Sequence, residues 1–313
     1  MPLRWGLCCQ FLDAPIRFRT ATHRYVRGLG PAGRRDYLAS IAEHNAAALE
    51  AAVRHCAALG IGAFRMTSQI LPLATHPESG YALGGLDSAG AIEAAFRRAG
   101  AAARELDVRL SLHPDQFVVL NSARAEVVDS AIGELVHQAG IAELVGADTI
   151  VLHAGSAAGG MSEALARLAA GLARLPDSVL SRLALENDDR FFTPRDLLPL
   201  CRTAGVPLVY DVHHHRCCPD GLGVDEATDL AAETWGEREA YAHISSPRDG
   251  WHSGNRRPHA ARIDPSDFPP GWIGRTMTID VEAKDKERAV LAIRAAVPEP
   301  AARATADGRS RRR

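Results

Sequence analysis

Residues 183–215 read LALENDDRFFTPRDLLPLCRTAGVPLVYDVHHH, and this stretch decides the fold. It holds two short apolar runs, LALE and LVYD, and each run ends on an acidic residue, Glu186 or Asp211. Between the runs, a Thr-Pro pair opens a segment of helical period (residues 193–204), and a glycine follows it. The stretch predicts a strand, a helix and a second, parallel strand, with both acids at the carboxyl ends of the strands.

The same pattern recurs along the chain. Six apolar runs end on, or are closely followed by, a side chain that can bind a metal, and they read RLSLHP, TIVLHAG, LALEND, LVYDVHHH, AYAHIS and MTIDVEA. Two further runs, near residues 4–9 and 62–68, bring the number of predicted strands to eight. Helical periods separate the runs at residues 34–60, 88–107, 122–146, 160–175, 193–204, 224–235 and 285–296. Expected helix caps are Ser88, Asn121 or Ser122, Ser162 and Thr193.

This alternation predicts a (β/α)8 barrel. A doubly wound sheet is less consistent with the sequence, which lacks the glycine-rich phosphate-binding motifs GxGxxG and GxxxxGK[ST]. No linker divides residues 1–297, so we expect one barrel domain, with its site at the carboxyl ends of the strands. Residues 298–313 are rich in Pro, Ala and Arg and are expected to form a disordered basic tail.

Composition excludes few functions. The formal net charge is −2 and the pI is near 6.7, so any phosphate binding must come from local basic patches. The six cysteines show no spacing typical of a disulfide framework or a zinc ribbon. Together with the lack of any long apolar segment, this predicts a cytoplasmic protein without a membrane partner.

Nine side chains at or near the predicted strand ends form the candidate metal site. They are His76, His113, His153, Glu186, Asp211, His214, His243, His259 and Glu282. A single histidine at a strand end is more often a hydrogen-bonded core residue, but buried acids without cations cost several kcal/mol each. Nine ligands exceed the shell of one ion and suit about two or three divalent ions, with Mn²⁺, Zn²⁺ and Fe²⁺ all compatible with a nitrogen and oxygen shell.

At these positions the chain resembles the UV damage endonucleases. The resemblance rests on FRMTSQILPLATHP, SLHPDQF, LALENDD, YDVHHH, AHISSP and IDVEAKDKE, in this order, and runs from about Arg4 to about Ala296. It implies a metal-dependent (β/α)8 enzyme that nicks damaged double-stranded DNA immediately 5′ to a photoproduct or other distorting lesion. The implied products are 3′-OH and 5′-phosphate ends, formed by hydrolysis with two or three ions, usually manganese.

The resemblance also implies roles for individual residues. All nine candidate ligands match metal-binding positions of the family, and Gln116 with Phe117 matches the Gln–aromatic pair that probes the base stack at a lesion. We expect Glu186 to bridge ions, with Glu282, Asp211 and His243 completing their shells. Lys284 is expected to contact phosphate or a carboxylate, or else to form a plain surface ion pair.

Basic loops after the first and seventh predicted strands independently favour DNA as the partner. They contain Arg17 and Arg19, and Arg256 and Arg257 around Trp251, which is expected either to stack on a base or to pack within its loop. We expect the protein to act as a monomer and to associate with the nucleoid.

The chain departs from the family pattern at three places. Tyr241 stands where members carry a lysine reported as carboxylated and part of the metal shell, Leu7 stands where some carry tyrosine, and CCQFL replaces a polar DNA-contacting turn. Two alternatives follow. One is a sugar-isomerase-like barrel, which shares the Glu186–Asp211–His243–Glu282 arrangement but does not need the additional histidines. The other is a lesion-binding protein with impaired catalysis, suggested by Tyr241.

Overall fold

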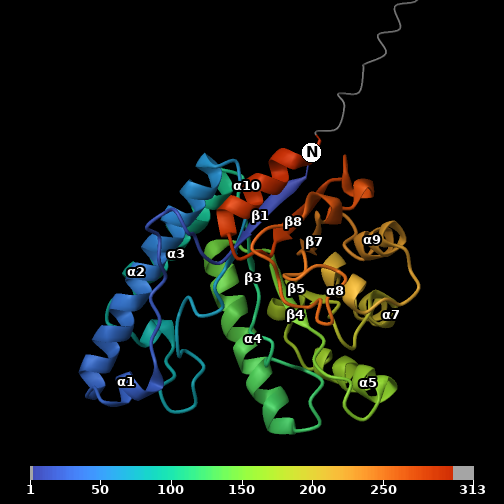
Figure 1. Cartoon of the computed structure of the whole chain (residues 1–313). Coiled ribbons are helices and arrows are strands. Elements are labelled where there is room, and N and C mark those ends of the chain that lie inside the picture. Colours follow the sequence, from blue (N-terminus) through green and yellow to red (C-terminus); the bar gives the residue numbers. More distant parts are fainter. Residues whose placement is uncertain (1–2, 299–313) are drawn as a thin grey trace, which may run out of the picture.

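The computed structural model describes residues 3–298, which contain a closed barrel of eight parallel strands in sequential order (Figure 1). The strands are β1 (Arg4–Cys8), β2 (Ala63–Met66), β3 (Arg109–Leu112), β4 (Thr149–His153), β5 (Leu183–Glu186), β6 (Leu208–Asp211), β7 (Ala240–Ile244) and β8 (Met277–Val281). Every predicted strand is present, and the (β/α)8 prediction is confirmed.

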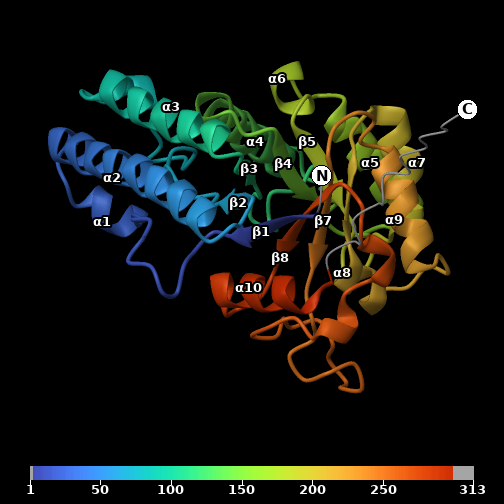
Figure 2. The same ribbon diagram turned by 90° about the horizontal axis from the view of Figure 1, so that it is seen from above.

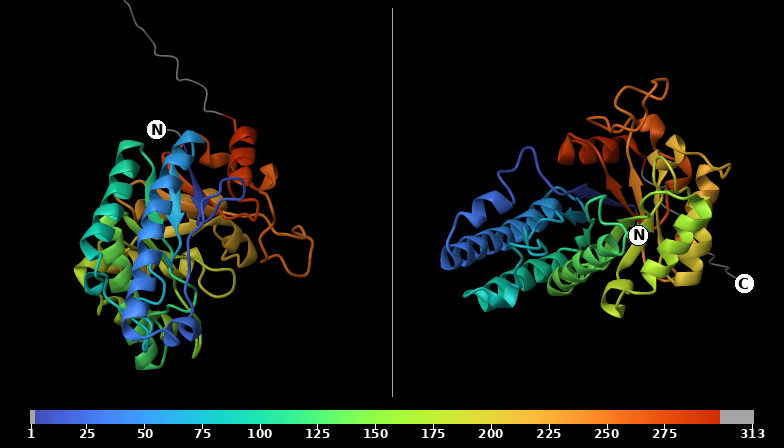
Figure 3. Two further views of the ribbon diagram at one scale, coloured as in Figure 1. Left: turned by 90° about the vertical axis from the view of Figure 1, so that its left-hand side faces the viewer. Right: turned by 90° about the horizontal axis from the view of Figure 1, so that it is seen from below.

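Helices follow the strands and surround the barrel. They are α1 (His23–Arg27), α2 (Pro31–Ala58), α3 (Ala89–Glu105), α4 (Ala125–Val145), α5 (Met161–Leu172), α6 (Asp177–Leu180), α7 (Pro194–Ala204), α8 (Val212–Cys217), α9 (Val224–Glu233) and α10 (Lys286–Ala296), with short 3₁₀ turns at Leu83–Gly85, Pro265–Asp267 and Pro270–Trp272. The long helices α2 and α3 lie side by side and extend past the strands on one side of the barrel (Figures 2 and 3).

The helix boundaries correct two of the four expected caps and confirm the positions of the other two, Ser88 and Thr193. Ser162 lies within α5, whose N-cap is Gly160, and α4 begins after Arg124 rather than after Asn121 or Ser122. Ser88 is the N-cap of α3, but its side chain accepts no capping hydrogen bond. Small polar residues near a helix start also serve loops, so their presence alone does not fix the first turn. Thr193 does cap α7, within a reciprocal capping box with Asp196.

Apolar side chains pack in two places. A large cluster fills the layer between the strands and the helices. A smaller one contains Val151, Ala184, Val209 and Tyr241 from the strands and Trp235 from the segment between α9 and β7. Ion pairs of Arg4 with Glu239 (2.9 Å) and Arg109 with Asp148 (3.1 Å) lie at the amino ends of the strands. Side chains fill the barrel toward the amino ends of the strands. The candidate site is therefore expected at the carboxyl ends, as in other barrels of this type.

The predicted tail, residues 298–313, lies outside the described residues except for Pro298. Between residues 3 and 298, no helix is both long and apolar enough to cross a membrane.

Candidate metal centre

Glu186 lies at the centre of the candidate site, at the carboxyl end of β5, and four imidazoles surround its carboxylate. Oε2 is 2.9 Å from Nε2 of His113 and 3.6 Å from Nδ1 of His153. Oε1 is 2.9 Å from Nδ1 of His243 and 3.4 Å from Nδ1 of His214. These imidazoles come from β4, β7, α8 and the loop after β3, so closure of the barrel brings together residues that are far apart in the chain.

Asp211 and His214 come together through a local turn. Asp211 ends β6 and caps α8, where its Oδ1 accepts from the backbone N–H of His214 at 2.7 Å. The turn carries the His214 ring back to the strand end, with Nδ1 at 3.6 Å from Oδ2 of Asp211. Asn187 joins β5 to β6 by exchanging two hydrogen bonds of 2.9 Å with the backbone of Asp211. The LEND and DVHHH segments therefore position each other.

Two groups of side chains have the spacing of a metal shell, and they share one member. His113, His153 and Glu186 form the first group, and Glu186, Asp211 and His214 form the second. Within each group, one potential ligand atom from every residue lies within 4.8 Å of the others. A carboxylate that belongs to both groups has the position expected of a bridge between two ions.

Glu282 follows β8 and extends the cluster on the other side of the barrel mouth. Its Oε1 is 3.5 Å from Nδ1 of His243, and its Oε2 is 3.5 Å from Nδ1 of His259. Glu282 also forms an ion pair of 2.5 Å with Arg65 of β2. A cation supplied by the protein is thus already present beside this carboxylate, whereas the neighbours of Glu186 and Asp211 are imidazoles.

The buried cluster shifts the pKa values of its members in opposite directions. Burial opposes ionisation of Glu186, but the imidazoles of His243 and His153 hold its pKa well below the ordinary value. Burial works against a charged His243, yet the carboxylate of Glu186 raises the pKa of this ring to about 9. For His153 burial dominates and lowers the pKa to about 4. The protonated ring of His243 thus balances the charge of the carboxylate while His153 stays neutral, and divalent cations can balance that charge instead.

Unpaired buried atoms test whether these residues fit a metal. Nδ1 of His153 and Oδ2 of Asp211 are both buried without a hydrogen-bond partner among the described residues. Buried polar atoms without partners are rare in native proteins and require an explanation. His153 belongs to the first of the two groups above and Asp211 to the second. An imidazole nitrogen and a carboxylate oxygen both bind divalent cations, so the residues fit metal ions.

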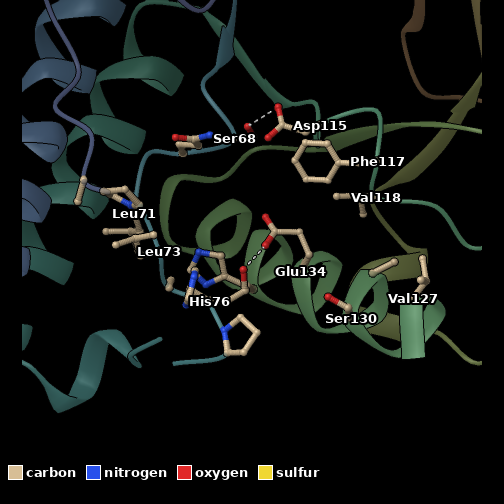
Figure 4. A pocket seen from close by; sticks show the side chains of 18 of the residues that line it. Ser68, Leu71, Leu73, His76, Asp115, Phe117, Val118, Val127, Ser130 and Glu134 are labelled. Atoms are coloured by element: carbon tan, nitrogen blue, oxygen red, sulfur yellow. Dashed lines mark hydrogen bonds between the residues drawn. The ribbon is translucent and has the colours of Figure 1, made fainter. Parts of the chain in front are cut away.

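His76 lies apart from this centre. The metal centre lines a cavity of about 430 Å³, together with Gln116. His76 lines a second cavity, of about 540 Å³ (Figure 4). Its Nδ1 accepts from the backbone N–H groups of Glu78 and Ser79. Its ring stacks on His23, with 4.4 Å between centroids. The assignment of His76 as a ligand stays a prediction.

Gln116 and Phe117 lie between the two cavities. Gln116 lines the cavity of the metal centre, whereas Phe117 lines the second one and leaves 73% of its surface exposed. Figure 4 shows Phe117 and Val118 on the side of this cavity opposite to Leu71 and Leu73. Adjacent residues of one loop thus project a polar and an aromatic side chain beside the barrel mouth.

The expected DNA-contacting residues differ in how free their side chains are. Arg17 donates hydrogen bonds to the backbone carbonyls of Phe11, Ala14 and Ile16. Arg19 donates to the backbone carbonyl of Ser40. Both arginines therefore shape the loop between β1 and α2 in addition to carrying charge. Arg256 and Arg257 are exposed on the long loop after β7, which projects from the barrel (Figure 3). Arg257 also pairs with Asp189, with 3.6 Å between Nε and Oδ2.

Trp251 and Lys284 also lie near the loop after β7. Trp251 donates to Asp267 at 2.7 Å and its ring lies 5.4 Å from that of His213, so it packs within the loop. Lys284 is exposed, and its backbone N–H donates to Ala260. A direct role of Lys284 in catalysis stays a prediction.

Sequence reasoning missed two charged residues in the barrel, Arg65 and Asp280. Each is the last but one residue of its strand, and the strand-end pattern considered only the residues that end or follow the strands. Alternation along β8 does carry a signal, because Asp280 precedes Glu282 by two residues and the two therefore face the same side of the strand. Tyr241, which replaces the family lysine, directs its hydroxyl to Asp280 at 3.0 Å rather than to the two metal groups.

Three comparisons show which known proteins this chain is similar to. The family model described as UV-endonuclease UvdE matches residues 3–302. The UV DNA damage endonuclease of Deinococcus radiodurans is 35% identical over 308 residues, which cover 94% of this chain and 95% of that protein. The crystal structure of SacUVDE superposes with a TM-score of 0.82 at 27% identity and covers 93% of this chain and 96% of its own.

A sugar epimerase shares the architecture at a much lower level. D-psicose 3-epimerase from Clostridium cellulolyticum H10 has a TM-score of 0.54 and 11% identity, and covers 94% of this chain and 96% of its own. At that identity the likeness shows the fold alone.

Proposed function

Because the chain belongs to the UV-endonuclease UvdE family, we infer that it is a DNA repair endonuclease that acts on ultraviolet lesions. Nearly the whole chain is covered by relatives with that name, which favours this function over the sugar-isomerase alternative. The predicted cut lies immediately 5′ to the lesion and leaves 3′-OH and 5′-phosphate ends. A DNA substrate supports the expectation that the protein works in the cytoplasm, associated with the nucleoid.

One observation carries the catalytic part of this proposal: two metal-shell groups share the buried carboxylate of Glu186. Close-spaced divalent ions stabilise both the attacking and the leaving oxygen of a phosphoryl displacement. His113 and His153 would hold one ion and Asp211 and His214 another, while Glu186 contributes to both. Manganese is the proposed metal, and zinc or iron is compatible with the same ligands.

The remaining residues position DNA. Phe117 can stack where nucleotides have left the duplex, and Gln116 can form hydrogen bonds beside the metal centre. Arg256 and Arg257 are exposed near the barrel mouth and can contact backbone phosphates without reading sequence. The chain therefore combines a site for hydrolysis with an adjacent aromatic side chain for detecting a distorted stack.

Nicking of ultraviolet-irradiated plasmid in the presence of Mn²⁺ tests this function. Wild type should convert supercoiled irradiated plasmid to open circles and leave unirradiated plasmid intact. Glu186→Gln should reduce the rate by about 100-fold or more, because it removes charge from both proposed ion sites. Glu239→Gln, at the opposite end of the barrel, is the matched control and should retain nicking. Undiminished nicking by Glu186→Gln would refute the catalytic assignment.

The alternative of a lesion-binding protein with impaired catalysis rests on Tyr241, whose hydroxyl contacts Asp280 and Ser111 rather than the metal groups. The same plasmid assay separates it from the endonuclease when combined with a binding measurement. Specific retention of irradiated DNA without nicking, with Mn²⁺ bound to the protein, would favour the binding protein.

A further inference from the structure

A fourth carboxylate, Asp280, lies inside the barrel directly beside the ligand histidine of β7. Its side chain is fully buried, as is that of His243. The strand register pairs Asp280 with His243 on β7 and with Gly6 on β1. Paired residues of parallel strands face the same side, so the carboxylate and the imidazole point into the barrel together.

Neighbouring residues hold one oxygen of this carboxylate in place. Oδ1 of Asp280 accepts from the hydroxyl of Tyr241 at 3.0 Å, and that hydroxyl is in turn 3.0 Å from Oγ of Ser111. Gly6 provides the space, because a Cβ at this position would lie 2.1 Å from Oδ1. The orientation of Asp280 is therefore set by β1, β3 and β7 together.

The second oxygen faces two nitrogen atoms that need an acceptor. Oδ2 of Asp280 is 3.9 Å from Nε2 of His243 and 3.8 Å from Nε of Arg65. All three atoms are buried, and none has a hydrogen-bond partner within residues 3–298. Arg65 is also held by its Nη1, which pairs with Glu282, so its orientation does not depend on Asp280 alone. Among the described residues His243 has no other partner at Nε2, so Asp280 can set the orientation of this imidazole.

We propose that Asp280 is a positioning residue for metal binding, which accepts the Nε2 proton of His243 and thereby leaves Nδ1 free to bind a cation. A neutral imidazole carries one N–H, so a carboxylate at Nε2 fixes the tautomer in which Nδ1 has its electron pair available. In this structure Nδ1 faces Glu186 and Glu282, the side on which cations are expected. Carboxylate partners of this kind commonly orient ligand histidines. The inference rests on the proposed metal-dependent function.

Titration of metal-free, full-length protein with Mn²⁺ tests this role without reference to activity. Asp280→Asn should weaken Mn²⁺ binding by about 10–100-fold, measured from the electron paramagnetic resonance signal of free Mn²⁺. The amide keeps the size and can still accept from Tyr241, but its N–H₂ group faces Nε2 and favours the tautomer with the proton on Nδ1. Asp129→Asn is the matched control, because it makes the same substitution on the exposed face of α4, where Asp129 pairs with Arg174, and its affinity should be unchanged.

Two further measurements separate positioning from folding. Nitrogen-15 spectra of histidine-labelled protein loaded with Zn²⁺, a diamagnetic ion that requires a neutral ring, should show the Nε2–H tautomer of His243 in wild type and a shift toward Nδ1–H in Asp280→Asn. Tyr241→Phe, which keeps the ring but removes the donor to Asp280, should weaken Mn²⁺ binding in the same direction even if Asp280→Asn does not fold.

Wild-type Mn²⁺ affinity in both variants would overturn this inference alone and leave the endonuclease in place. Failure of wild type to bind Mn²⁺ would overturn both proposals.

Discussion

Phe117 is the most exposed of the large apolar side chains in the described part of the chain, at 73%. It follows Gln116, which lines the metal cavity, so the exposed ring stands next to the place where a phosphodiester is expected to bind. A ring in this position contributes little to folding, because water already surrounds it in the native state. We therefore expect the Phe117 ring to contribute to DNA binding rather than to stability.

Phe117→Ala should weaken binding to a duplex with a single photoproduct by about 5–150-fold, since aromatic stacking on a base contributes about 1–3 kcal/mol. Fluorescence anisotropy with lesion-containing and undamaged duplexes measures the difference. Val136→Ala, which removes an apolar side chain that is 45% exposed on α4, is the control and should change neither affinity. Equal loss of affinity for both duplexes in Phe117→Ala would argue against lesion recognition by the ring.

The strand-end pattern anticipated which acids and imidazoles converge, because closure of a parallel barrel forces the ends of its strands together. Glu186, Asp211 and His243 show this directly. The same reasoning did not find Asp280 or the Arg65–Glu282 ion pair, because Asp280 and Arg65 each precede the last residue of a strand. Which side chains meet at that level is set by the register between strands. Nor did it anticipate that His76 would lie in a separate cavity, because loop conformation is set by local contacts such as its stacking on His23.

Helix α7 follows β5, the strand that carries Glu186. The first turn of α7 is held by side-chain capping, which sets where the loop between β5 and α7 ends. Oγ1 of Thr193 accepts from the backbone N–H of Asp196 at 3.3 Å, and the Asp196 carboxylate accepts from the backbone N–H of Thr193 at 3.0 Å. Helix α3 begins at Ala89, and the side chain of its N-cap, Ser88, forms no such bond. The two helix starts thus offer a matched comparison of a formed and an unformed side-chain cap.

Thr193→Ala should lower the free energy of unfolding by about 1 kcal/mol, the usual contribution of an N-cap hydroxyl. Ser88→Ala should change it by less than about 0.5 kcal/mol, because no capping hydrogen bond is lost. Urea unfolding followed by circular dichroism measures both. A larger loss for Ser88→Ala than for Thr193→Ala would show that the cap geometry described for these helices is wrong.

Element type was more predictable than element ends. The helical periods and apolar runs located every strand and the long helices, because a buried face imposes its period on the sequence. Gly146 and Gly205 mark helix ends correctly, since both adopt the left-handed conformation that glycine tolerates. Short elements such as α6 and α8 were not predicted, because one turn of helix has too few residues to show a period.

For the molecule as a whole, metal binding and folding should be linked, because the two metal-shell groups exist only when the barrel is closed. Glu186, His153 and Asp211 come from three different strands. A ligand that binds only the native state raises the free energy of unfolding by about 2.7 kcal/mol at a concentration 100 times its Kd.

Mn²⁺ at saturating concentration should therefore raise the midpoint of thermal unfolding, and excess chelator should reverse the shift. Glu186→Gln should show a much smaller Mn²⁺-dependent shift, because it loses the carboxylate shared by both groups. Differential scanning calorimetry with and without chelator is the measurement. An equal shift in wild type and in Glu186→Gln would place the stabilising ions elsewhere.

The central claim is that divalent cations lie between the acids and imidazoles at the barrel mouth. Anomalous diffraction at the manganese edge, from crystals grown with Mn²⁺, tests it most directly. We predict separate peaks beside Glu186, one near His113 and His153 and another near Asp211 and His214. A map without anomalous peaks there, in which Glu186 contacts only the surrounding imidazoles and Glu282 only Arg65, would contradict the account.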